Sequence, residues 1–464
     1  MAHISFDFNR VIGKIKPMHA IGQPPLLGAN STYFHYLKDA HIPYSRLHDV
    51  GGAYGGGIYV DIPNIFRDFD ADENLPESYD FAFTDFLITS LMENDCEPVF
   101  RLGVTIENYI RIKRYYTDPP RDFAKWARIC EHVIRHYTEG WADGFTYSIR
   151  YWEIWNEPEN FETPELNQMW SGTAEQYYEL YTITAKHLKA CFGDRIKVGG
   201  YASCGFTAIF GDLKKYGIDE EVKMTEGLLR MANSPRFQNF VTFFFGFLEH
   251  IKKNGAPLDF FSWHSYSAVE NVLIMSRFVH KTLREYGYGD VETHLNEWNN
   301  AADKTLRGSS LAAVRAAAML CGMQNSEATM LCYYDARIGA SVYGGMFNPI
   351  TYEPFCLYYS FAAFGELYAL GDQIACESPE KHLYVVGATD GEGKAVMIAN
   401  NTGKNRTITT NLGEDMRVYL IDSENALTLT DYNAAEFTVR REQVVLIKNC
   451  KSVEAQDQER GQNA

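Results

Sequence analysis

Between residues 27 and 371, short apolar segments alternate with longer segments that have the periodicity of amphipathic helices. The expected strands of this region are residues 26–30, 44–48, 97–102, 151–156, 197–200, 260–265, 292–296 and 329–334. The main expected helices are residues 79–94, 122–137, 173–191, 236–253 and 308–324. Thr173 and Gln176 have the spacing of a capping box at the start of one of them. Eight strand–helix units predict an α/β fold of the (β/α)8 TIM-barrel type.

A doubly wound sheet would also suit this alternation. It would need a phosphate-binding turn, and the glycine-rich stretch at residues 51–57 lacks the Gly-Lys-Ser/Thr ending and does not open a helix. We therefore interpret residues 51–57 as a loop above the barrel.

The pattern changes after Gly371. Strand-like runs follow at residues 382–388, 394–400, 416–422 and 437–447, with a turn at residues 390–393. The first 16 residues alternate with a period of two and are expected to add a strand. We expect a barrel at residues 17–371, a smaller antiparallel β-sandwich at 372–450 together with 1–16, and a disordered polar tail at 451–464.

Two expected strands end in a glutamate that stands beside an asparagine. Residues 151–158 read YWEIWNEP, in which a strand ends at Asn156 and Glu157, and residues 293–298 read THLNEW, with Glu297 beside Trp298. In a barrel the carboxyl ends of all strands point to one face, so side chains that end separate strands converge there. Glu157 would end the fourth strand and Glu297 the seventh. Together they would form the carboxylate pair that glycoside hydrolysis requires.

Glu153 lies earlier in the same strand as Glu157. At that position an ion pair inside the barrel, to Arg101, is a better interpretation than catalysis. An acid catalyst works best with a raised pKa, and Trp155 and Pro158 are expected to shield Glu157 from water and raise its pKa.

The chain resembles glycoside hydrolase family 39, whose barrels carry two acids at the ends of the fourth and seventh strands. The matching segments are WNEP at 155–158, NEW at 296–298, SRLHD at 45–49 and SWHSYS at 262–267. The resemblance covers the barrel and extends to the trailing sandwich. It implies that Glu157 is the general acid/base and that Glu297 is the nucleophile.

The same resemblance implies a sugar-binding set around the two acids. Asn156 would hold the 2-hydroxyl, His48 and His264 would bind other hydroxyls, and Tyr266 would orient Glu297. Trp298 and the aromatic stretches 109–116 and 343–347 are also expected to line the cleft.

The last barrel strand departs from the pattern of the family's β-xylosidases. Residues 331–338 read LCYYDARI, without the tryptophan and the acidic pair expected there, so the sugar pocket should differ. Arg337 has two interpretations: an ion pair with Asp335, or a bidentate partner for the carboxylate of a uronate substrate.

The sequence as a whole predicts a retaining exo-glycosidase, with β-xylosidase as the first expectation. A β-glucoside, β-galactoside, α-L-arabinopyranoside or uronide would suit the same machinery. The alternative from another class is a barrel that binds carbohydrate without catalysis. The mechanism needs no cofactor and no metal, and the resemblance suggests a homo-oligomer.

The amino-acid composition limits the kinds of binding partner and the compartment that we expect. The chain has 43 basic and 60 acidic residues, and the resulting net charge of −17 disfavours binding to nucleic acid or anionic membranes. Its nine cysteines are scattered without a CxxC, which favours a reducing compartment over a disulfide framework or a zinc site. With no apolar leader at the start of the sequence, we expect a cytoplasmic protein.

Overall fold

The computed structural model describes residues 2–28, 30–50, 60–105, 117–220, 222–339, 341 and 343–449. The loop expected at residues 51–57, the aromatic stretch 109–116 and the tail 451–464 lie outside the described residues.

Eight parallel strands close into a barrel, in the order in which they follow along the chain. They are β2 (Ala20–Gly22), β3 (Tyr44–Leu47), β4 (Glu97–Leu102), β5 (Tyr151–Ile154), β6 (Lys197–Ser203), β7 (Phe260–Ser265), β8 (Glu292–Trp298) and β9 (Met330–Tyr334). The predicted TIM barrel is confirmed, and seven of its strands overlap their predictions.

The first barrel strand was predicted wrongly. It is β2 at residues 20–22, whereas in the predicted segment 26–30 Leu27 and Asn30 form an isolated antiparallel bridge. Pro24 and Pro25 carry no backbone N–H for a strand ladder, and Gly28 has a φ of 62°. A strand therefore cannot continue through this segment.

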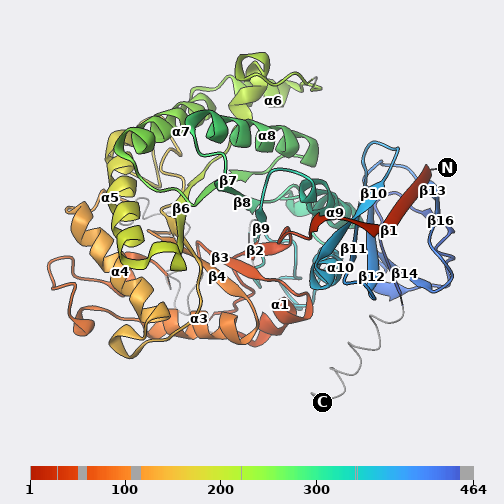
Figure 1. Ribbon diagram of the computed structural model, residues 1–464, viewed down its shortest axis with the longest axis horizontal. Coiled ribbons are helices and arrows are strands. Elements are labelled where there is room, and N and C mark those ends of the chain that lie inside the picture. Colours follow the sequence, from red (N-terminus) through yellow and green to blue (C-terminus); the bar gives the residue numbers. More distant parts are fainter. Residues whose placement is uncertain are drawn as a thin grey trace.

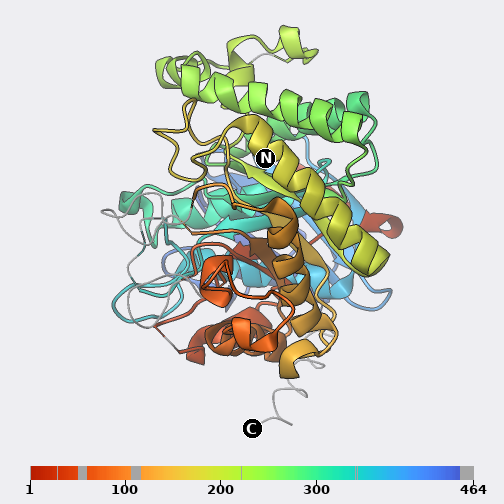
Figure 2. The ribbon, with the colours of Figure 1, turned by 90° about the vertical axis from the view of Figure 1, so that its left-hand side faces the viewer.

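Helices surround the barrel strands (Figures 1 and 2). They are α1 (His35–Asp39), α2 (Ile62–Ile65), α3 (Ala82–Glu93), α4 (Phe123–Thr138), α5 (Ala174–Phe192), α6 (Glu226–Ala232), α7 (Pro235–Asn254), α8 (Val269–Tyr286), α9 (Ser310–Gln324) and α10 (Cys356–Leu370). The five predicted helices are present. Helix α10 was not predicted, because its sequence has one charged residue and therefore a weak amphipathic pattern.

The second unit is a nine-stranded sheet beside α9 and α10, at the right of Figure 1. Its strands, in the order of their pairing, are β15 (Ala426–Leu429), β14 (Met416–Ile421), β17 (Val444–Asn449), β12 (Lys394–Asn400), β11 (Leu383–Thr389), β10 (Asp372–Glu377), β1 (Ala2–Lys14), β13 (Arg406–Thr410) and β16 (Glu436–Val439). All neighbours are antiparallel except β1 and β13, which are parallel. The predicted strand 437–447 is two strands, β16 and β17, separated by a turn in which Glu442 has a φ of 60°.

Two apolar cores stabilise this sheet. Side chains such as Ile4, Val396 and Val418 pack on one another in a core of its own. Met397 and Leu446, on the alternate positions of β12 and β17, belong instead to the large core that includes the barrel helices. The sheet therefore shares an apolar core with the barrel and its helices.

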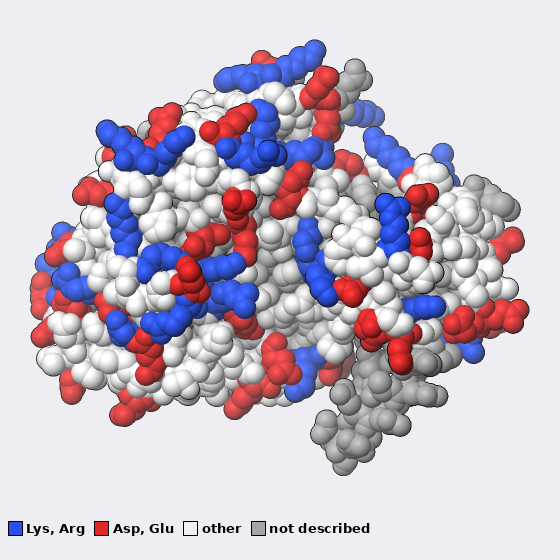
Figure 3. Space-filling model, in the orientation of Figure 1, with Lys and Arg blue, Asp and Glu red and all other residues white. Residues whose placement is uncertain are grey.

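Basic and acidic side chains are interspersed over the described surface on the face that Figure 3 shows. Among the described helices, none combines the length and the apolar character that crossing a bilayer requires.

Candidate active site

A cavity of about 490 Å³ opens where the barrel strands end at their carboxyl termini. Its lining comes from segments that follow β3, β5, β6 and β9 and from the ends of β7 and β8. Six of the eight predicted site residues line it: His48, Asn156, Glu157, His264, Tyr266 and Glu297.

The carboxylates of Glu157 and Glu297 face each other across this cavity. An oxygen of each lies within 4.8 Å of the other, and Nδ1 of His264 lies between them, 2.8 Å from Oε1 of Glu157 and 3.7 Å from Oε2 of Glu297. Carboxyl groups about 5–5.5 Å apart suit a retaining glycosidase, whereas an inverting one needs about 6.5–9.5 Å to admit water. Oxygens within 4.8 Å of each other are compatible with the retaining spacing.

Glu157 is held by an unusual backbone. Both Trp155 and Glu157 have left-handed conformations, with φ of 71° and 47°. The N–H of Glu157 donates to the carbonyl oxygens of Tyr201 and Ala202, at 3.2 and 3.1 Å, which ties the end of β5 to β6. Such conformations cost about 1–3 kcal/mol each and cluster at functional sites. The strained turn directs the Glu157 side chain into the cavity.

A bulge in β8 places Glu297. Leu295 pairs with Trp263 and Glu297 pairs with His264, so Asn296 is an extra residue in β8. The bulge turns two consecutive side chains inward: Asn296 donates to Oε1 of Glu153 inside the barrel, and Glu297 faces the cavity.

Trp298 must then point away from the barrel axis, and the prediction that it contacts sugar is corrected. It is fully buried, with its ring 5.2 Å from that of Tyr333 and 6.3 Å from that of Phe361. Trp298 belongs to the core between the barrel and its helices.

Arg46 joins three strands of the barrel, a role that its motif SRLHD does not indicate. Its guanidinium lies 2.7 Å from Oε2 of Glu153, 3.2 Å from Oε2 of Glu297 and 2.5 Å from Oδ1 of Asn156. The predicted partner of Glu153 was wrong, because Arg101 pairs with Asp61 at 2.6 Å. Arg46 and His48 are two residues apart, so along an extended strand their side chains lie on the same face. Because His48 was expected in the cavity, this spacing is the sequence signal that would have placed Arg46 inside the barrel.

Two further predicted residues lie against this network. The hydroxyl of Tyr266 donates to Oε1 of Glu297 at 2.5 Å. Burial, and then the charges of Arg101 and Arg46, lower the pKa of His48 well below its usual value, so the ring is neutral. Nε2 of His48 lies 3.2 Å from Oδ2 of Asp49.

Arg337 lies outside the cavity lining. Its Nε donates to Oε1 of Gln23 at 2.8 Å, and its Nη2 donates to the carbonyl oxygen of Asp49 at 3.2 Å. Asp335 accepts from the backbone N–H of Arg337 at 3.2 Å. These contacts give no support to the uronate interpretation, since the guanidinium faces a separate small pocket that includes Gln23 and Ile338.

The two facing carboxylates have pKa values shifted in opposite directions. Burial raises the pKa of Glu297 to about 7, and repulsion from Glu157 adds to this rise, against the lowering effects of His264, Arg46 and Tyr266. Burial acts on Glu157 too, but the hydrogen bond and charge of His264 outweigh it and lower its pKa to about 2. The expected rise in the pKa of Glu157 rests on its sequence neighbours alone, and it is wrong because His264 contacts the carboxylate. Because the groups interact, these values describe the pair, which retains one proton up to about pH 7.

Two residues just after Glu157 were missed by the sequence analysis. Nδ2 of Asn160 donates to Oε2 of Glu157 at 2.6 Å. Glu159 is buried, and burial raises its pKa to about 8, so it is a neutral acid at pH 7. Its Oε1 accepts from the hydroxyl of Ser203 and the N–H of Cys204, both at 2.7 Å, which fixes the loop after β5 against the end of β6.

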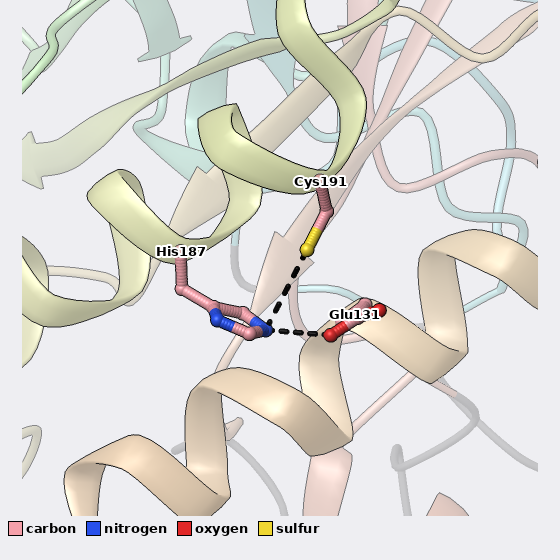
Figure 4. Close-up of side chains that lie close together, drawn as sticks. All are labelled: Glu131, His187 and Cys191. Atoms are coloured by element: carbon pink, nitrogen blue, oxygen red, sulfur yellow. Dashed lines mark hydrogen bonds and ion pairs between the residues drawn. The ribbon is translucent and has the colours of Figure 1, made fainter.

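A second group of potential metal ligands lies away from the barrel mouth, between α4 and α5 (Figure 4). Nε2 of His187 is 2.6 Å from Oε2 of Glu131 and 3.8 Å from Sγ of Cys191. The other oxygen of Glu131 accepts from Nε of Arg135 at 2.7 Å. Burial and the Glu131 charge raise the pKa of Cys191, so the thiol stays protonated. These three side chains therefore form a polar contact that joins α4 and α5.

A closed parallel barrel whose mouth holds two facing carboxylates is the arrangement of the barrel glycosidases that use a carboxylate pair. The chain belongs to the family described as Glycosyl hydrolases family 39, whose sequence profile matches residues 23–320. The predicted resemblance is thereby confirmed.

Individual relatives are distant. A β-xylosidase of Geobacillus stearothermophilus is 24% identical over 262 residues, which cover 54% of this chain and 42% of that protein. A glucosidase from Croceicoccus marinus has a similar structure, with a TM-score of 0.76, 20% identity, and coverage of 97% of this chain and 98% of that one. A family 39 β-xylosidase from Caulobacter crescentus follows with a TM-score of 0.65, 18% identity, and coverage of 96% and 99%. At these identities the two structures show a shared fold.

Proposed function

We propose that this protein is a retaining exo-glycosidase that hydrolyses equatorial glycosidic bonds by double displacement. The observation that carries the proposal is the carboxylate pair, Glu157 and Glu297, with oxygens within 4.8 Å in one cavity. Membership of family 39 supports the same reaction.

In the first step Glu157 gives its proton to the glycosidic oxygen while the carboxylate of Glu297 attacks the anomeric carbon. The aglycone leaves as an alcohol, and the sugar becomes an ester of Glu297. Arg46 and Tyr266 both donate to Glu297 and favour its ionised form. When Nδ1 of His264 accepts from Glu157 rather than donating to it, the proton of the pair resides on Glu157.

In the second step Glu157 takes a proton from water, and the resulting hydroxide attacks the anomeric carbon and releases Glu297. Esterification has removed the charge of Glu297, which lowers the tendency of Glu157 to hold a proton and prepares it as the base. Asn156 accepts from Arg46 through Oδ1, so its NH2 group is left for the sugar. A bond from that group to the 2-hydroxyl would strengthen at the transition state.

The preferred sugar is proposed to be β-xylose, as in the β-xylosidase relative of Geobacillus stearothermophilus. A β-glucoside is the second candidate, since the sequence around the last barrel strand departs from the β-xylosidase pattern and a structural neighbour is a glucosidase. Kinetics with a panel of nitrophenyl glycosides would separate these sugars.

Labelling with a 2-deoxy-2-fluoro glycosyl fluoride of the preferred sugar tests the mechanism. The expected result is one adduct per chain, on Glu297, identified by peptide mass spectrometry. An adduct on another residue would refute the assignment, and a protein that binds sugar but neither hydrolyses nor becomes labelled would be a non-catalytic barrel.

A further inference from the structure

We infer that the part of the cavity beside Glu157 binds an aromatic aglycone, so that the natural substrates are aryl or arylalkyl glycosides rather than oligosaccharides. This inference rests on the proposed function and specifies its leaving group. The general acid protonates the leaving oxygen, so the aglycone must lie next to Glu157.

The cavity has two chemically different sides. His48 and Asp49 follow β3, and Tyr334 ends β9; these polar side chains suit sugar hydroxyls. In the closed order of the barrel, β5 and β6 lie opposite β9 and β2. The wall after β5 and β6 is the one that includes Glu157, and it lies across the barrel from Tyr334 at the end of β9.

Beside the polar residues Gln168, Cys204 and Thr207, the wall on the Glu157 side carries an apolar cluster. It is formed by Phe161 after β5, Met231 at the end of α6, and Phe237 and Phe240 on the first turns of α7. The rings of Phe237 and Phe240 are 5.3 Å apart, and Met231 is 43% exposed at the edge of the cavity. Figure 1 shows α6 beyond α7, at the top of the molecule. Apolar side chains on the wall of an otherwise polar cavity mark a ligand surface.

Arg236 adds a flat cationic surface to this wall. Its guanidinium carbon lies 4.6 Å from the ring centre of Phe161 and 5.6 Å from that of Phe240. Nε and Nη2 donate to the carbonyl oxygen and Oδ1 of Asn160, at 2.7 and 3.1 Å. Asn160 in turn donates to Glu157, so the wall is connected directly to the proton donor. Guanidinium and phenyl faces both stack on aromatic rings, whereas the apolar cluster offers a second sugar no strong hydrogen-bonding partner.

Benzyl and methyl glycosides of the preferred sugar test the inference, because their leaving alcohols have similar acidity. We expect kcat/KM to be at least tenfold higher for the benzyl glycoside, since burial of a ring contributes a factor of that order. The benzyl glycoside should also be preferred over the disaccharide of the same sugar.

Phe237→Ala should reduce the benzyl-to-methyl ratio at least fivefold, in proportion to the stacking surface removed. Leu229→Ala is the matched control: Leu229 is exposed on α6, the helix of Met231, but does not line the cavity, and the ratio should not change. A wild-type ratio near one, or a preference for the disaccharide, would overturn the inference while turnover leaves the proposed function intact. Absence of turnover and of labelling on every glycoside would overturn both.

Discussion

At the scale of residues, the site is a competition between two buried carboxylates for one proton. Glu297 is surrounded by donors that favour its charge, Arg46 and Tyr266, yet repulsion from Glu157 and burial hold its pKa high. His264 lies between the two acids, with Nδ1 2.8 Å from Oε1 of Glu157 and 3.7 Å from Oε2 of Glu297. The pair thus provides one acid and one nucleophile only while it holds a single proton.

This predicts the basic limb of the pH profile. The pKa of Glu297 is raised to about 7, so the last proton of the pair is lost as the pH rises through about 7, and activity falls above it. The measurement is kcat/KM against pH with a nitrophenyl glycoside. Profiles that stay flat to strongly alkaline pH would contradict a shared proton.

The burial of Glu297 and its repulsion from Glu157 should also make the stability of the folded protein depend on pH. A carboxyl whose pKa is raised in the folded state destabilises the fold fully above that pKa and not at all below its unfolded value. For Glu297 that window runs from 4.5 to about 7. Glu297→Gln should therefore raise Tm relative to wild type at pH 8, and the difference should vanish near pH 4.5. A variant that is less stable than wild type at pH 8 would show that the ion pair of Glu297 with Arg46 stabilises the fold by more than burial and repulsion destabilise it.

Removal of the proposed acid should depend on the leaving group. Glu157→Ala is expected to lower kcat/KM about 10²–10⁴-fold for glycosides with poorly acidic leaving groups, and far less for dinitrophenyl glycosides, which need no protonation. Azide should restore turnover by attacking the glycosyl-enzyme in the space left by the carboxylate. Equal losses on both kinds of substrate would mean that Glu157 is not the acid.

At the scale of elements, local devices fix where helices begin and where strands turn their side chains. The bulge at Asn296 and the left-handed residues 155 and 157 each direct one acid. The predicted capping box at α5 is confirmed, because Oγ1 of Thr173 accepts from the N–H of Gln176 and Oε1 of Gln176 accepts from the N–H of Thr173.

Loss of that cap should be measurable. Thr173→Ala is expected to lower the free energy of unfolding by about 1 kcal/mol, since the N–H of Gln176 loses its acceptor, Oγ1 of Thr173. Urea unfolding monitored by circular dichroism would measure it. Thr242→Ala, on the exposed face of α7, is the control and should not destabilise the protein. Similar losses for both variants would show that the capping box contributes nothing specific.

At the scale of the whole molecule, the barrel and the sheet are joined by a common core. Helices α9 and α10 pack on β11 and β12, and Met397, Ala399 and Leu446 of the sheet belong to the barrel's core cluster. The first strand, β1, pairs with β10 and β13, so the start of the chain also belongs to the sheet.

A chain that ends at Gly371 should therefore fail to fold. Truncation would expose the apolar faces of α9 and α10 and leave β1 without its partners. We expect an insoluble product without glycosidase activity, and in the full chain we expect Met397→Ala to cost about 2–5 kcal/mol. A soluble truncated barrel with wild-type turnover would show that the sheet is a separate domain.

The sequence by itself determined the barrel, the pairing of Glu157 with Glu297 at its mouth, and five of the ten α-helices of the described residues. These follow from periodicity and from strand ends that must share one face. The tertiary structure decided the partner of Glu153, the role of Arg46, and the positions of Trp298 and Arg337. Those depend on which strands become neighbours and on a one-residue bulge in β8. No regular period encodes a bulge, and the proton shared by two acids depends on a histidine 107 residues away in sequence.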